Sequence, residues 1–81
     1  MSLIESPVVF REKDYDWIIY TNDHPPPHCH IVKDRKTKGK IVFETLIFAR
    51  GCTIPEHHLK TLQEITRTRL NELQQHWGIH H

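Results

Sequence analysis

Apolar and polar residues alternate through the first half of the chain, which is the pattern of β-strands. Residues 7–11 predict a short strand that opens on a proline, a residue tolerated at a strand's beginning. In residues 14–21 apolar side chains fall on both faces, so this strand is expected to be central. Residues 28–33 and 40–43 continue the pattern, and residues 46–49 are expected to extend the sheet.

The period changes near Thr53, where apolar positions begin to recur at steps of three and four. Thr53 and Glu56 have the spacing of a capping box, and Pro55 suits a first helical turn. The stripe that follows consists of Leu59, Leu62, Thr66, Leu70, Leu73 and Trp77. It predicts one helix of ~24 residues, or ~36 Å, with Gly78 as its C-cap.

These elements predict a single α+β domain over residues 1–81. We expect a small antiparallel sheet of three to five strands, covered on one face by one long C-terminal helix. The 81 residues suffice for one domain but not for two. Apolar residues make up only 37% of the chain, so its core is thin. We expect either a marginally stable monomer or a chain that gains burial by pairing with another copy or another protein.

Residues 22–27 predict a loop, because Asn and Asp favour turns and three consecutive prolines donate no backbone hydrogen bonds. His24, His28 and His30 follow the spacing H-x3-H-x-H across this loop and the next strand. Since side chains alternate along a strand, His28 and His30 should share one face and Cys29 should point to the other. The stiff proline corner should hold His24 near the same edge.

Three converging imidazoles support more than one kind of chemistry. His24, His28 and His30 could bind Zn²⁺ or another divalent metal and leave one position open for water. They could also act without metal as a general base and a general acid, a pair able to cleave a phosphodiester, with Asp23 orienting an imidazole. In a third interpretation the histidines only satisfy backbone carbonyls, and a cis X-Pro bond makes the prolines a folding device.

Basic residues gather just beyond this segment, although the net charge of the chain is only +1. The cluster consists of Lys33, Arg35, Lys36, Lys38 and Lys40. Only Asp34 opposes it, so these residues are candidates for RNA contact through phosphates. The alternative is a solvated hairpin tip over residues 34–39, whose lysines prevent edge pairing.

The remaining signals concern the cellular environment. The start of the chain does not have the pattern of a signal peptide, so we expect Cys29 and Cys52 to be reduced and the protein to be cytoplasmic. The chain has no apolar run of the ~20 residues that a membrane span needs, so we expect no membrane partner. His57 and His58 do not have the i,i+4 spacing of a helical metal pair and are expected at the surface.

Residues 20–31, YTNDHPPPHCHI, resemble the signature of a bacterial family of small proteins of unknown function. That signature is Asn-Asp-His-x-Pro-Pro-His-x-His, and the resemblance extends over residues 15–77. It implies a short α+β domain whose signature histidines are His24, His28 and His30. Family members are often encoded beside another small protein and are regarded as candidate toxin–antitoxin modules, which implies a small cognate partner. Cys29 departs from the family pattern, where an aromatic or aliphatic residue is usual.

The sequence therefore leads to one principal hypothesis and two alternatives. The principal hypothesis is a toxin-like cytoplasmic module that contacts RNA or a partner protein. The contact would be made by residues 22–30, called the His-Pro segment below, and by the basic hairpin that carries Lys33 to Lys40. The alternatives are a metal-binding protein that uses the same histidines, and a non-catalytic interaction module. The sequence does not decide whether the protein is an enzyme.

Overall fold

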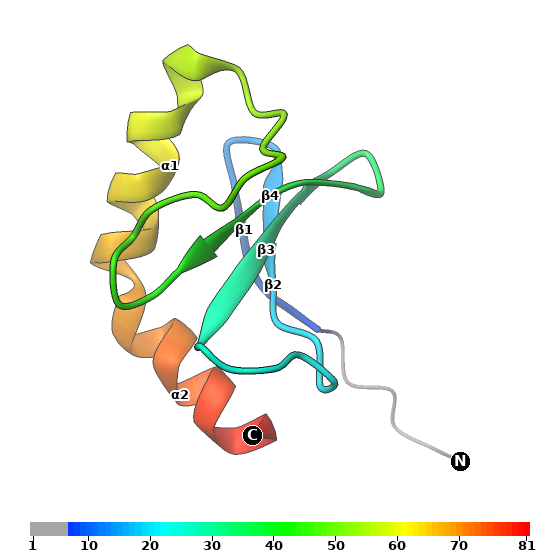
Figure 1. Ribbon diagram of the computed structural model, residues 1–81, viewed down its shortest axis with the longest axis vertical. Helices are drawn as coiled ribbons and strands as arrows, with labels where there is room; N and C mark the ends of the chain where they lie inside the picture. Colours follow the sequence, from blue (N-terminus) through cyan, green and yellow to red (C-terminus); the bar gives the residue numbers. More distant parts are fainter. Residues whose placement is uncertain (1–6) are drawn as a thin grey trace.

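The computed structural model describes residues 7–81, and Figure 1 shows an antiparallel sheet with two helices packed against it. The strands are β1 (Val8–Glu12), β2 (Tyr15–Ile18), β3 (His28–Lys33) and β4 (Lys36–Val42). They lie side by side in chain order, each antiparallel to the next. The helices are α1 (Glu56–Thr68) and α2 (Leu70–His80). The predicted α+β class is therefore confirmed.

The centre of the core lies where β2 and β3 face α1. Trp17 and Ile31 are cross-strand partners, and both are fully buried. The indole N–H of Trp17 donates a hydrogen bond of 2.8 Å to the hydroxyl of Thr66 on α1. That hydroxyl in turn donates to the carbonyl of Leu62 at 2.7 Å. The polar atoms at this sheet–helix contact are thus paired, as buried polar atoms need to be.

The predicted apolar stripe faces the sheet, but it lies on two helices rather than one. Both helices meet at Arg69, whose φ of −111° and ψ of 22° depart from α-helical values. The Arg69 guanidinium lies 3.7 Å over the ring of Phe10, and it donates to the carboxylate of Glu12 at 3.4 Å. The junction is therefore fixed against β1, and the prediction of one continuous helix was wrong. Neither helix is long and apolar enough to cross a membrane.

The predicted helix ends also differ from the observed ones. Pro55 is the N-cap of α1, and it makes no capping bond with a side chain. Thr53, the expected cap, instead donates both its backbone N–H and its hydroxyl to the carbonyl of Lys38, at 2.7 and 3.4 Å. Gly78 lies inside α2 rather than beyond its end. Thr53 thus anchors the segment before α1 to the sheet.

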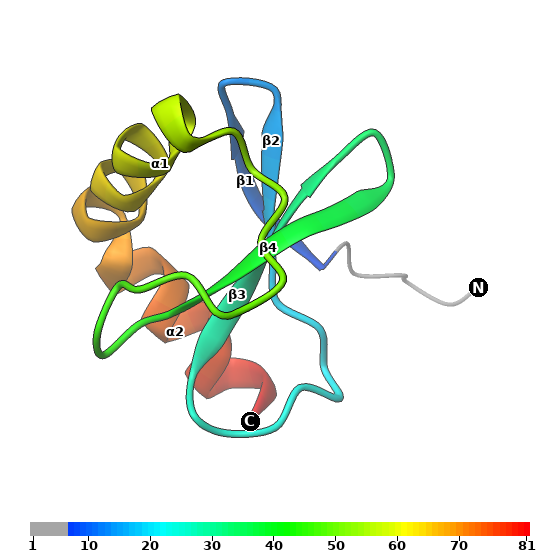
Figure 2. The same cartoon turned by 45° about the horizontal axis from the view of Figure 1, so that its top comes forward.

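The segment 43–55 runs back along β4 before it enters α1, and it crosses in front of that strand in Figure 2. The N–H of Ala49 donates to the carbonyl of Lys40 at 2.8 Å, and Phe48 forms an isolated bridge with Ile41. The predicted extension of the sheet over residues 46–49 is limited to this bridge.

The β3–β4 hairpin is tighter than the sequence predicted. Its turn consists of Asp34 and Arg35, both with positive φ, 53° and 64°. Positive φ at both central residues is typical of two-residue hairpin turns that match the strand twist. β4 consequently begins at Lys36 rather than at Lys40, and the expected turn over residues 34–39 was wrong.

Candidate functional site

The loop between β2 and β3 brings the His-Pro segment to the lower end of the sheet in Figure 1. Its first turn is closed twice: the N–H of Tyr20 donates to Asp23 Oδ2 at 2.9 Å, and the N–H of Asp23 donates to the Tyr20 carbonyl at 3.1 Å. The Pro25–Pro26 peptide bond is cis. The carbonyl of Pro27 then accepts the N–H of Phe43 at 3.0 Å, so the loop is also joined to the segment after β4.

Three side chains that could each offer a ligand atom to a metal ion converge where this loop enters β3. His30 Nε2 lies 3.1 Å from Asp23 Oδ1, and His28 Nε2 lies 3.8 Å from the same oxygen. One ligand atom from each residue lies within 4.8 Å of the other two. The rings of His28 and His30 are 5.2 Å apart, as strand alternation predicts for a shared face, while Cys29 is fully buried in the core. Asp23, His28 and His30 are called the Asp-His-His cluster below.

Backbone groups orient the candidate ligand atoms of this cluster. His28 Nδ1 lies 2.8 Å from the carbonyl of Pro26, and because a carbonyl can only accept, Nδ1 carries the proton. The lone pair of neutral His28 is therefore on Nε2, the nitrogen that faces Asp23. The N–H of Tyr20 occupies Asp23 Oδ2 and leaves Oδ1 for the two imidazoles.

The cluster is largely shielded from solvent without being sealed. The side chains of Asp23, His28 and His30 are 12%, 11% and 16% exposed. Burial raises the pKa of Asp23, but the hydrogen bonds from His30 and from the Tyr20 backbone, together with the charge of both imidazoles, outweigh it and leave this pKa below its usual value. The carboxylate is therefore an anion at neutral pH.

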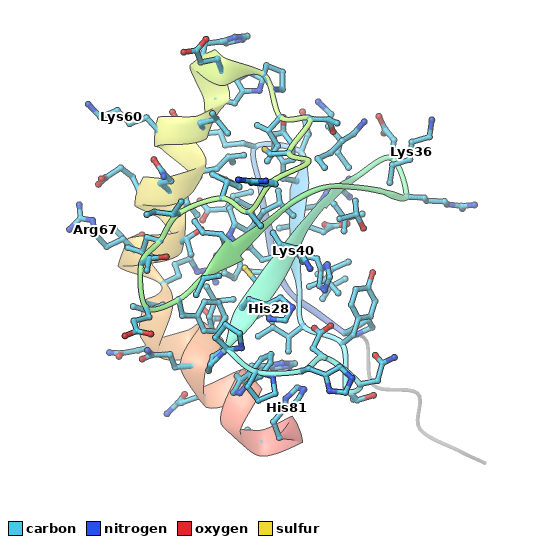
Figure 3. The ribbon with its side chains drawn as sticks, in the orientation of Figure 1. His28, Lys36, Lys40, Lys60, Arg67 and His81 are labelled. Carbon is cyan, nitrogen blue, oxygen red and sulfur yellow. The ribbon has the colours of Figure 1, made fainter. Side chains whose placement is uncertain are left out.

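Aromatic rings enclose the cluster on two sides. The ring of Tyr20 packs edge-on against His30, with 4.9 Å between centroids. The ring of Trp77 from α2 lies 5.4 Å from that of His28, and His81 stacks on Trp77 at 3.8 Å. Figure 3 shows His28 and His81 at the same end of the molecule. The C-terminal helix thus forms one wall of the site.

The geometry brings together a different trio from the one the spacing suggested. His24 is exposed in the loop and lies outside the cluster. Asp23, which was predicted only to orient an imidazole, offers the third ligand atom instead. Spacing along a strand identified His28 and His30. The place of Asp23 depends on the turn formed with Tyr20, which alternation along a strand does not describe.

The five basic residues are divided among different surroundings. Lys33 Nζ lies 5.2 Å from the ring centroid of Tyr15, near the β1–β2 turn. Lys40 is the cross-strand neighbour of His30. Figure 3 places Lys36 at the far end of the hairpin and Lys40 between it and His28. The predicted RNA contact therefore concerns an elongated hairpin surface rather than a compact patch.

Comparison with known protein families gives a match over most of the chain. A family described as "Domain of unknown function (DUF4160)" matches residues 15–78, which include the Asp-His-His cluster, all of α1 and most of α2. Neither the curated proteins nor the solved structures gave a significant match to the chain.

Proposed function

Because the chain belongs to the DUF4160 family, whose function is unknown, we propose a function from the geometry of the Asp-His-His cluster. The proposal is that this protein binds one divalent metal ion, Zn²⁺ or an ion of similar ligand preference. The ligand atoms are Asp23 Oδ1, His28 Nε2 and His30 Nε2. The observation that carries the proposal is the convergence of both imidazole nitrogens on one carboxylate oxygen.

The distances support this assignment. Ligands ~2.0–2.1 Å from a tetrahedral zinc ion lie roughly 3.3 Å from one another. The two measured separations from Asp23 Oδ1, 3.1 Å to His30 Nε2 and 3.8 Å to His28 Nε2, lie on either side of that value. All three ligand atoms lie within 4.8 Å of one another, which is the proximity that a shared ion requires.

The groups behind the ligands support it as well. Metal-bound histidines usually donate their other N–H to a carbonyl or carboxylate, which fixes the tautomer and the ring orientation. His28 makes this contact with the Pro26 carbonyl. Two histidines and one carboxylate form a recurrent ligand set for zinc and for non-haem iron, and three protein ligands leave a position for water.

The test measures binding of Zn²⁺ to the full-length protein, purified without a nickel column and stripped with a chelator. Competition against a chromophoric chelator should give one tight site per chain. Asp23→Asn, His28→Ala and His30→Ala should each weaken it by roughly 100-fold or more, since losing even a supporting contact costs 10–100-fold. His57→Ala, which removes an exposed histidine of α1, is the matched control and should leave the affinity unchanged.

The absence of a tight site would contradict the proposal, and so would two other results. One is zinc binding that His57→Ala weakens as much as the cluster variants do, because scattered surface histidines would then account for it. The other is binding that His24→Ala abolishes and Asp23→Asn leaves intact, because the ligands would then be the three histidines rather than the Asp-His-His cluster.

A second candidate function is contact with RNA along the β3–β4 hairpin, which projects away from both helices in Figures 1 and 2. Arg35, Lys36 and Lys40 are exposed on it. If these side chains contact phosphates, RNA affinity should fall steeply with salt, and Lys36→Gln with Lys40→Gln should reduce the salt slope by about two.

A toxin-like role further predicts that expression arrests growth and that His28→Ala relieves the arrest. Normal growth with intact cellular RNA would contradict that role.

A cytoplasmic location belongs to the same proposal. Cys29 and Cys52 are both free thiols, as is usual in reducing compartments. A small cognate protein remains the partner that the family resemblance suggests, and co-purification with the product of the neighbouring gene would test it.

A further inference from the structure

A cavity of about 380 Å³ lies at the opposite end of β3 from the Asp-His-His cluster. It opens between the β1–β2 turn, the end of β3 and the first turns of α1. The side chains that matter for its chemistry are those of Lys13, Asp14, Tyr15, Lys33, His58 and Thr61. None of them takes part in the metal site proposed above, and its volume is in the range of small-molecule pockets.

Contacts within the fold organise the walls of this cavity. Tyr15 is only 3% exposed, and its hydroxyl lies 3.0 Å from Nδ1 of His58, which joins β2 to α1. The ammonium group of Lys33 lies 5.2 Å from the centroid of the same tyrosine ring. Lys13 and Asp14 form a two-residue turn, with φ of 54° and 67°, which sets the direction of the chain at the rim. One lysine thus reaches the cavity from the β1–β2 turn and the other from the end of β3.

The charges at this cavity favour an anion. Lys13 and Lys33 carry two positive charges against the single carboxylate of Asp14, so the lining is cationic even when His58 is neutral. Lysine binds phosphate as a compact point charge, and the Thr61 hydroxyl and the His58 imidazole add further hydrogen-bonding groups. The two lysines, the threonine and the histidine together suit the three terminal oxygens of a phosphomonoester better than the two oxygens of a carboxylate.

The size of the cavity and its floor favour an organic ligand over inorganic phosphate. A cavity of about 380 Å³ is several times larger than one phosphate group, and Leu62 and Tyr15 are both among the residues that line it. We propose that this cavity binds a small phosphorylated organic molecule of about the size of a nucleoside monophosphate, with the phosphate between Lys13 and Lys33.

The test is a titration of the ¹⁵N-labelled full-length chain with adenosine monophosphate, followed by amide chemical shifts. Chelator in the buffer removes metal ions that could hold the phosphate elsewhere. Saturable shifts should centre on Tyr15, Thr61 and Leu62. Adenosine and inorganic phosphate, each lacking half of the ligand, should bind roughly tenfold or more weakly.

Paired variants separate a site from general electrostatic attraction. Lys13→Gln with Lys33→Gln should weaken binding roughly tenfold or more, whereas Lys36→Gln with Lys40→Gln removes the same charge outside the cavity and should have little effect. Equal losses in both pairs, shifts centred on the hairpin, or no saturable shifts up to about 10 mM nucleotide would each overturn the proposal. Asp23→Asn should leave nucleotide binding intact, so failure of the metal site would not be mistaken for failure of this one.

Discussion

At the scale of single residues, Thr66 connects the two layers of the fold. It is fully buried in the stripe of α1, accepts the indole N–H of Trp17 and donates to the Leu62 carbonyl. A threonine in an otherwise apolar stripe is easily read as a neutral spacer. Here it is the acceptor that allows the largest buried side chain of β2 to keep its N–H inside the core, since an unpaired buried donor is costly.

Thr66→Val tests this role. The valine fills the same volume but offers no acceptor, so the Trp17 indole loses its partner and the free energy of unfolding should fall by ~1–3 kcal/mol. Thr68→Val makes the same chemical change two residues later, where the hydroxyl is exposed and donates to Ile65, and should change stability by less than about 0.5 kcal/mol. Urea unfolding of both variants measures the difference, and equal losses would show that the buried bond is unimportant.

The candidate site was predictable only in part, also at this scale. Alternation along a strand is a strong local rule, and it placed His28 and His30 on one face with Cys29 in the core. The choice between Asp23 and His24 depended on which way a loop side chain turns. That direction is set by the reciprocal hydrogen bonds of Asp23 with Tyr20, and no periodicity in the sequence encodes them.

At the scale of elements, Gly39 leaves room for the segment 43–55 to lie against β4. A Cβ atom at this position would lie 3.1 Å from Cys52 Sγ and 3.2 Å from both Ile54 Cδ1 and Phe48 Cδ1. A side chain at this position would therefore crowd the segment before α1 where it crosses the strand. Gly78, in α2, has nothing within 4 Å of the corresponding position.

Replacing each of these glycines by alanine should give effects of opposite sign. Gly39→Ala crowds three neighbours, and because overpacking costs ~1–3 kcal/mol against a smaller gain in chain entropy, it should destabilise the fold by about 1 kcal/mol. Gly78→Ala should stabilise the protein by roughly 0.5–1 kcal/mol, since alanine is the better helix former and meets no obstruction. Thermal unfolding of the two variants measures both effects, and stabilisation by Gly39→Ala would contradict the packing argument.

Elements with a clear period were predicted well, and their boundaries less so. β3 has the predicted bounds. Four residues of the predicted helical stripe are buried, and the other two, Leu59 and Leu70, are partly buried against the core. No proline or glycine marks the break between the helices at Arg69. The break is instead held in place by contacts of Arg69 with Phe10 and Glu12 of β1, which the local sequence does not reveal. Turn length in the β3–β4 hairpin likewise followed from backbone twist rather than from the composition of its basic residues.

At the scale of the whole molecule, the two cysteines differ in access to solvent. Cys29 is fully buried, and burial, with a smaller contribution from Asp23, raises the pKa of its thiol. Cys52 is only half-buried, in the segment that crosses β4. Because the thiolate is the reactive form, Cys29 should react only when the core opens, whereas Cys52 should react in the native state.

A thiol reagent at mildly alkaline pH should therefore give one rapid and one slow phase of equal amplitude. The slow phase should accelerate with urea in proportion to the opened population, and Cys29→Ala should remove it, while Cys52→Ala should remove the rapid phase. Two rapid phases in the absence of denaturant would show that the core around Cys29 opens far more readily than its burial implies.

The junction at Arg69 also determines how the helical end of the chain tolerates insertions. Thr66 lies before it and bonds Trp17, and Trp77 lies after it and packs on His28, so two contacts fix the rotation of the chain at separate points. One added residue between them would turn everything beyond by about 100° and carry the indole of Trp77 away from the sheet. Length in this stretch is therefore under tighter constraint than the identity of its exposed side chains, and natural variants should differ there by substitution rather than by insertion or deletion.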